Sequence, residues 1–282
     1  MRVDCFLYPQ ARKKAMTFSF DDGVVEDRKL VPMLEKYSVK GTFNISSGCF
    51  GKREAIPGSE MIHEVITEKE VLNLYKNMEI SAHGYHHLSM TDCPPDSALS
   101  EAVLDRVSLE SLTGRQIRGF AYPYGDFSPE SEEGLKKAGF HYSRTTVDTH
   151  SFDLPANFME WNPTCHIHDP KRDELLDEFL SLQLSPFSKN PVLFYIWGHS
   201  FELALDNSWN EFDNFLKKAS EKEDVWYASN GEIEEYITAI KRLEYTADRT
   251  KIYNPSARDV WIEIEDKPVR IKGGSAYVQG RQ

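Results

Sequence analysis

The chain has no excess of basic residues and no long apolar run. Its 282 residues include 33 Lys and Arg against 45 Asp and Glu, which gives a formal net charge of -12. No basic stripe offsets this charge, so nucleic-acid phosphate and anionic membrane surfaces are disfavoured as partners. No stretch approaches the ~18 apolar residues of a transmembrane helix, and we therefore expect no membrane partner. These features leave the oligomeric state undetermined.

Cysteine is scarce and widely spaced. Cys5, Cys49, Cys93 and Cys165 form no Cys-x-x-Cys pair, which disfavours a zinc ribbon or a thioredoxin-type redox motif. We expect four free thiols in a reducing compartment. The N-terminus also lacks the apolar core of a secretory signal, so we expect a cytoplasmic protein, with secretion after signal removal as the open alternative.

Short β-rich segments recur along the chain, each followed by a helical stretch. Strands that alternate with helices predict βα units and a parallel sheet. Seven such units favour barrel-like closure over a flat, doubly wound sheet. The predicted strands are residues 15–20, 42–45, 78–82, 117–122, 140–146, 192–197 and 225–228.

The intervening helices carry recognisable start signals. Thr67 and Glu70 form a capping box, and Ser128-Pro129 opens another helix. The segment 147–170 interrupts the alternation, and loops of that length inside a compact domain tend to be functional.

The pattern changes after a helix around residues 231–242. Short strand-like runs separated by turns follow it. We therefore expect a catalytic barrel over residues 1–242 and a β-rich appendage over residues 243–282 packed on it.

Two adjacent acids, Asp21 and Asp22, end the apolar run 16–20 and are followed by Gly23. Like charges delivered side by side by a buried strand are costly unless a cation holds them. A divalent metal would bind one carboxylate directly and leave its neighbour free to take a proton from water.

Three histidines, His83, His86 and His87, follow another predicted strand. In a parallel α/β architecture, catalytic groups gather at the C-terminal ends of the strands. Histidines four apart converge on one ion if the segment turns helically. The cluster alone fits a metal site or a solvated polar loop, and its combination with Asp22 favours the metal site.

Four segments, in this order, resemble the motifs of the polysaccharide deacetylases of carbohydrate esterase family 4. The resemblance spans residues 15–240 and implies a distorted (β/α)7 barrel, here with a short C-terminal β appendage. The matching segments are Phe18–Gly23, His83–His87, Tyr122–Gly125 and Trp197–His199.

The resemblance also implies roles for single residues. Asp22, His83 and His87 would bind a divalent metal, commonly zinc, with cobalt, nickel or manganese as alternatives. Asp21 would be the general base and His199 the general acid. The implied activity is hydrolysis of a non-peptide C–N amide bond, with removal of acetyl groups from N-acetylglucosamine units of an oligo- or polysaccharide.

Five further residues are candidates for the substrate side of the site, namely Tyr124, Trp197, Trp161, Arg144 and His166. We expect the Tyr124 backbone N–H to face the oxyanion, and the Tyr124 and Trp161 rings would suit a sugar face, with core packing as the alternative. Trp197 stands where the family has leucine and would reshape an acetyl pocket. His166 lies with His168 on one strand face, and this face either lines the cleft or forms a polar edge.

The chain departs from the family pattern at several positions. Gly84 stands where the second motif usually has a loop-bracing Ser or Thr, and Ala121 stands where the third motif begins with a base-orienting arginine. The fourth motif, an acid and tryptophan pair, is not recognisable. We predict that Arg144, on the next strand, reaches Asp21 in place of the missing arginine; an ordinary barrel-end arginine is the alternative.

Three other functions stay open at this point. In the first, the chain hydrolyses a small intracellular amide. In the second, it is a carbohydrate-binding homologue with weakened catalysis. In the third, it is an oxygenase in which two histidines and a carboxylate bind Fe(II). The second aspartate and the late histidine favour hydrolysis, because an oxygenase needs neither as acid or base. The remaining histidines, among them His63, His141 and His150, are interpreted as structural.

Overall fold

The apolar run that ends in the two aspartates forms strand β2 (Lys14–Asp21), which is buried along its whole length. It lies inside a sheet of parallel strands in the order β8-β7-β6-β3-β2-β10-β9, and β11 (Val225–Tyr227) pairs with its first residues. This computed structural model describes residues 2–183 and 191–280. The other strands of the sheet are β3 (Gly41–Ile45), β6 (Glu79–Ala82), β7 (Gly119–Ala121), β8 (Tyr142–Arg144), β9 (Cys165–His166) and β10 (Val192–Gly198).

The sheet curls, and the chain around Trp161–Thr164 joins its two ends. The Trp161 N–H donates to the Ser143 carbonyl at 2.9 Å, and the Thr164 N–H donates to the Tyr195 carbonyl at 2.8 Å. This segment therefore lies between β8 and β10, and the predicted distorted (β/α)7 barrel is confirmed. All seven predicted strands form, and β9 is a two-residue strand in the segment where His166 and His168 alternate as on a strand.

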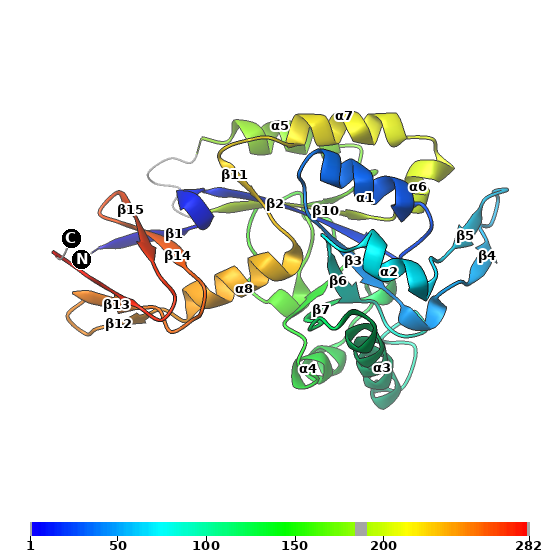
Figure 1. The fold of residues 1–282 in the computed structure, drawn as a ribbon, viewed down its shortest axis with the longest axis horizontal. Coiled ribbons are helices and arrows are strands. Elements are labelled where there is room, and N and C mark those ends of the chain that lie inside the picture. Colours follow the sequence, from blue (N-terminus) through cyan, green and yellow to red (C-terminus); the bar gives the residue numbers. More distant parts are fainter. Residues whose placement is uncertain (1, 184–190, 281–282) are drawn as a thin grey trace.

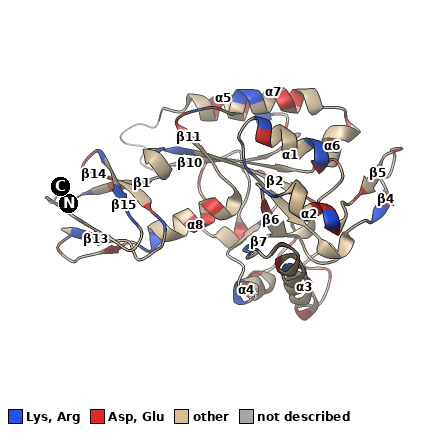
Figure 2. Ribbon diagram, viewed as in Figure 1, with Lys and Arg blue, Asp and Glu red and all other residues tan. Residues whose placement is uncertain are grey.

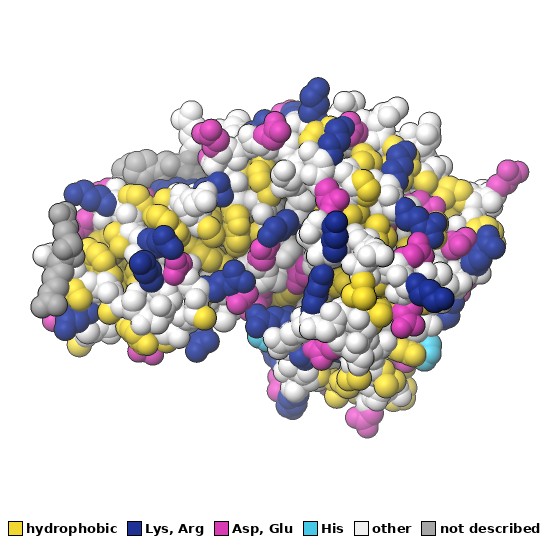
Figure 3. All heavy atoms as spheres, in the orientation of Figure 1, with side chains coloured by type: hydrophobic (Ala, Val, Ile, Leu, Met, Phe, Trp, Pro, Cys, Tyr) yellow, Lys and Arg dark blue, Asp and Glu magenta, His cyan; other side chains and the backbone are white. Residues whose placement is uncertain are grey.

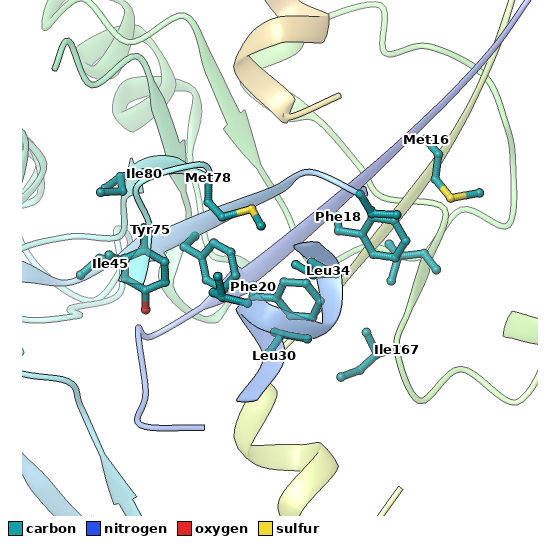
Figure 4. Packing of buried hydrophobic residues seen from close by; sticks show 14 of the residues in the cluster. Met16, Phe18, Phe20, Leu30, Leu34, Ile45, Tyr75, Met78, Ile80 and Ile167 are labelled. Carbon is teal, nitrogen blue, oxygen red and sulfur yellow. The ribbon is translucent and has the colours of Figure 1, made fainter. Parts of the chain in front are cut away.

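Helices cover the outside of the sheet (Figure 1). Leu30 and Leu34 of α1 (Asp27–Lys36) join one apolar cluster with Phe18 and Phe20 of β2 (Figure 4). Among the described residues, every helix is too short or too polar to span a membrane. The other helices are α2 (Glu68–Leu74), α3 (Pro95–Thr113), α4 (Pro129–Lys137), α5 (Arg172–Ser181), α6 (Ser200–Leu205), α7 (Trp209–Ala219) and α8 (Asn230–Lys241).

The last part of the chain forms two small antiparallel sheets. In the first, β1 (Val3–Leu7) pairs with β14 (Val260–Ile264), so the first strand of the chain lies among the last ones. Both termini are found at this end of the molecule (Figure 1). Whether residues 243–282 form a unit separate from 1–242 stays a prediction. The other strands are β15 (Lys267–Ile271), beside β14, and β12 (Glu244–Tyr245), β13 (Lys251–Tyr253) and β16 (Ala276–Val278) in the second sheet.

A hairpin of β4 (Arg53–Ala55) and β5 (Ile62–Glu64) lies at the opposite end of the molecule from these small sheets (Figure 1). It follows the second strand of the barrel and was not predicted. Strand β2 runs toward the hairpin, so the hairpin is at the end of the barrel where Asp21 lies.

The charged residues are spread over the molecule. Figure 2 shows acidic and basic residues interspersed along the helices and strands, and Figure 3 shows both signs side by side on the face in view. The negative net charge is therefore not concentrated on the visible face.

Candidate metal centre and catalytic site

Three parallel strands deliver the predicted catalytic groups to one end of the barrel. Asp21 is the last residue of β2, His83 follows β6 directly, and His199 follows β10 directly. Phe20 pairs in register with Gly198, so β2 and β10 end at the same level. The polar side chains meet there because the carboxyl ends of parallel strands share one edge.

The predicted metal ligands come together. The ligand atoms of Asp22, His83 and His87 all lie within 4.8 Å of one another. Asp22 Oδ1 is 3.7 Å from His83 Nε2 and 3.5 Å from His87 Nε2. His83 Nδ1 donates to the Ala121 carbonyl at 2.8 Å, which leaves the lone pair of Nε2 facing Asp22. One carboxylate and two imidazoles fit a divalent cation with positions left for water and substrate.

Three residues at the same place have a strained backbone. Asp22, His87 and Tyr124 have φ values of 74°, 59° and 61°, in the left-handed region that favours glycine. Such conformations persist only where the surrounding structure imposes them, and they cluster at functional sites.

The loop that carries the histidines is braced by two acids of α3. The His83 N–H donates to Asp105 Oδ2 at 2.8 Å, and the His86 N–H donates to Glu101 Oε2 at 2.7 Å. Gly84 between them has φ 79°, a conformation that would strain a Ser or Thr. The bracing that a hydroxyl gives in the family pattern is thus supplied here by carboxylates from a helix. Sequence analysis missed both acids.

His63, interpreted from the sequence as structural, contacts one of the predicted metal ligands. Its Nε2 lies 3.0 Å from Asp22 Oδ2. Burial alone would raise the pKa of Asp22, but the hydrogen bond from His63 and the nearby imidazoles hold that pKa well below its usual range. The Asp22 carboxylate is therefore ionised, and its Oδ2 is held by His63.

The predicted contact between Arg144 and Asp21 is confirmed. Arg144 Nη2 forms an ion pair with Asp21 Oδ2, and Asn44 Nδ2 donates to Asp21 Oδ1 at 2.7 Å. Burial raises the pKa of Asp21, but Arg144 and then His83 outweigh it, and the net shift is downward. Arg144 pairs in register with Ala121, so it enters from the neighbouring strand at the level where the family arginine would stand.

Two predicted substrate contacts do not fit the structure. Arg144 is 0% exposed and Trp161 is 1% exposed, so neither side chain reaches a bound sugar. Trp161 instead packs on Tyr142 and Phe158 in the core. Trp197 covers Arg144, with the guanidinium carbon 4.6 Å from its ring centre. Its partly exposed indole leaves substrate contact by Trp197 a prediction.

His199 lies between two acids. Its Nε2 is 3.9 Å from Asp21 Oδ2, and its Nδ1 is 3.2 Å from Glu202 Oε2, an ion-pair contact without the alignment of a hydrogen bond. Burial lowers the pKa of His199, but Glu202, Asp22 and Asp21 together raise it to about 9. Glu202, which sequence analysis missed, stands three residues after His199 at the start of α6, a spacing typical of helix capping.

His166 packs on the same acid. Its Nε2 is 3.1 Å from Glu202 Oε2, and its ring centre is 4.7 Å from that of Trp197. The predicted substrate role of His166 stays a prediction, and the structure adds that this residue helps to hold Glu202 beside His199.

A cavity of about 470 Å³ opens beside the predicted metal ligands. Asp22, His63, His87 and Tyr124 are among the residues that line it, and 66% of the surface of Tyr124 is exposed. The Tyr124 ring centre is 4.8 Å from that of His87. The predicted contact between Tyr124 and substrate therefore keeps its geometric support and stays a prediction.

Comparisons with known proteins find similarity in sequence and in fold. The polysaccharide deacetylase family model matches residues 9–143. A crystal structure described as a polysaccharide deacetylase from Mycobacterium smegmatis superimposes with a TM-score of 0.57 at 16% identity, covering 85% of this chain and 96% of that one. This likeness supports the fold.

Two further structures are similar at lower scores. A family 4 carbohydrate esterase from Streptomyces lividans in complex with acetate has a TM-score of 0.47 at 15% identity over 74% of this chain and 88% of that one. The Streptococcus pyogenes deacetylase PplD in complex with acetate has a TM-score of 0.44 at 20% identity over 51% of this chain. The alignment covers 61% of PplD, less than two thirds of its length. No curated protein matches the sequence significantly.

Proposed function

Because the polysaccharide deacetylase family model matches residues 9–143, we propose that this chain is a metal-dependent hydrolase of non-peptide C–N amide bonds. Its substrate is an oligo- or polysaccharide that contains N-acetylglucosamine, from which it removes acetyl groups. The observation that carries the proposal is the meeting of Asp22, His83 and His87 next to Asp21, which pairs with Arg144, and His199, whose Nε2 lies 3.9 Å from Asp21 Oδ2.

Each residue has a separate task in this reaction. A divalent cation, most simply zinc, held by Asp22, His83 and His87 would polarise the amide carbonyl and lower the pKa of water. Asp21, held by its partners, accepts the proton of the attacking water. His199 donates a proton to the departing nitrogen, because an amine is a poor leaving group until it is protonated.

The test is acetate release from N-acetylated chitooligosaccharides with added zinc or cobalt. We expect Asp21→Asn to lower kcat by about 10²–10⁴-fold, because an amide cannot accept the proton. Chelation should abolish release, and zinc should restore it. Asp96→Asn, which makes the same change on the exposed first turn of α3, is the matched control. Equal release by wild type and Asp21→Asn contradicts the proposal.

The cavity supports a second candidate substrate. A space of about 470 Å³ is in the range of sites that enclose a small molecule, which favours a small N-acetylated amide. Comparing kcat/KM for a monomer and for oligomers of increasing length separates the two substrates. Oligosaccharide binding without acetate release would instead identify a binding protein with weakened catalysis.

A further inference from the structure

The β4–β5 hairpin is tied to the segment that carries Asp22. The Ile66 N–H donates to the Gly23 carbonyl at 2.9 Å, and the Val25 N–H donates to the Glu64 carbonyl at 2.9 Å. His63 is the neighbour of Glu64 on β5. Its position relative to Asp22 is therefore set by backbone pairing on both sides, not by a free loop.

The two oxygens of Asp22 face different partners. Oδ1 faces His83 Nε2 and His87 Nε2 at 3.7 and 3.5 Å, while Oδ2 contacts His63 Nε2 at 3.0 Å. A carboxylate only accepts hydrogen bonds when it is ionised, so Nε2 of His63 carries the proton in this contact. With Oδ2 engaged, Oδ1 is the oxygen left for a cation.

His63 is held as a neighbour of the ligands and not as one of them. Among the described residues, the group of ligand atoms within 4.8 Å of one another contains Asp22, His83 and His87 without His63. The His63 ring packs edge-on against Phe201, with 5.1 Å between ring centres. Phe201 is the second residue of α6, directly after the helix start at His199 and Ser200. The His63 side chain therefore packs between its own hairpin and α6.

We propose that His63 is a positioning residue of the metal centre. By donating from Nε2 to Asp22 Oδ2, it fixes the orientation of the Asp22 carboxylate and presents Oδ1 to the cation. It also couples the hairpin, which lines the cavity with Glu54 and Ile56, to the metal ligands. The inference rests on the proposed function only in taking Asp22 as a metal ligand.

The test is titration of the metal-free protein with zinc or cobalt, followed by calorimetry and by the cobalt absorption spectrum. We expect His63→Ala to weaken metal binding about 10–100-fold, the usual effect of losing a hydrogen bond to a ligand. His63→Gln keeps an N–H donor at the same reach, and its affinity should stay within about threefold of wild type. His63→Asn, one methylene shorter, should bind as weakly as His63→Ala.

Two controls separate this effect from loss of structure. His141→Ala removes another partly exposed histidine beside an acid, Glu234, far from the site, and should leave the metal affinity unchanged. Thermal unfolding of each metal-free variant checks the fold. If His63→Ala does not fold, the metal affinities of His63→Gln and His63→Asn are compared instead. Both variants carry the same amide and differ only in its reach to Asp22, so this comparison tests the positioning role of His63.

The outcomes are distinguishable. Wild-type affinity in His63→Ala overturns the inference. Equal loss in His63→Gln and His63→Ala also overturns it, because the imidazole itself would then be a ligand. A wild-type protein that binds neither zinc nor cobalt overturns the proposed function instead, before any variant is compared.

Discussion

The ionised and protonated groups of the site are held by buried partners. Asp21 and Arg144 form a pair that is 2% and 0% exposed, and Trp197 covers the guanidinium. Removing one partner of such a pair costs about 3–5 kcal/mol, because the other charge stays buried and unpaired. The pair therefore keeps the base ionised only as long as both members remain.

Glu202 plays the corresponding part for His199. The pKa of His199 is about 9, so the imidazole is protonated below that pH and loses its proton as the pH rises through it. As a general acid it is active in the protonated form, and we expect kcat/KM to fall above about pH 9. In Glu202→Gln the pKa of His199 drops, and this alkaline limb should move down by roughly one pH unit.

The measurement is the pH profile of kcat/KM for acetate release. Glu211→Gln makes the same change in the first turn of the next helix and should leave the profile in place. An unchanged alkaline limb in Glu202→Gln would show that this carboxylate does not set the charge of His199.

Among the elements, helix α3 braces the loop that carries the predicted ligand His83. Asp105 is 0% exposed and accepts from the N–H of His83 and from the N–H and hydroxyl of Ser47, at 2.8, 2.8 and 2.6 Å. It thus joins the loop after β6 to the turn after β3. Burial raises the pKa of Asp105 to about 6, although its three donors favour the ionised form.

We predict that Asp105→Asn lowers the free energy of unfolding by about 1–3 kcal/mol, because the amide NH₂ would face one of these N–H donors. The His83 loop should loosen, so metal affinity should fall as well. Urea unfolding and zinc titration measure the two effects. Asp96→Asn on the same helix should cost less than about 1 kcal/mol. Unchanged stability and affinity in Asp105→Asn would contradict this role of α3.

Across the whole molecule, the end of the barrel opposite the site shares one apolar cluster with the small antiparallel sheets. The cluster includes Trp161 and Tyr195 from the barrel together with Val260 and Ile262 from β14. Tyr236 of α8 joins the two parts: its hydroxyl donates to the Leu7 carbonyl at 2.6 Å and accepts from the Trp261 N–H at 2.8 Å.

We predict that Tyr236→Phe destabilises the protein by about 1–3 kcal/mol, because a buried carbonyl and a buried N–H lose their partner. Unfolding should remain one transition by circular dichroism and by fluorescence, since barrel and sheets share a core. Tyr253→Phe, at an exposed tyrosine of β13, is the control and should have little effect. Separate transitions for the two parts would contradict the shared core.

The sequence alone determined the features that depend on local pattern. Alternating strands and helices predicted the barrel, because hydrophobic periods are set within each element. The proximity of Asp22, His83 and His87 was expected because Asp22 and His83 directly follow strands and the resemblance groups all three as metal ligands. Arg144 was predictable too, since a neighbouring strand brings its last residue to the same edge of the sheet.

Only the tertiary structure decided which residues act on this site from a distance. His63 and Asp105 contact the ligand residues 41 and 22 positions away, and β1 pairs with β14 across nearly the whole chain. The sequence around Asp105 or His63 does not mark either residue as functional, because acids and histidines are common in exposed loops and helices. The structure also placed Trp161 in the core. Such contacts depend on how elements pack, which the local pattern of residues does not contain.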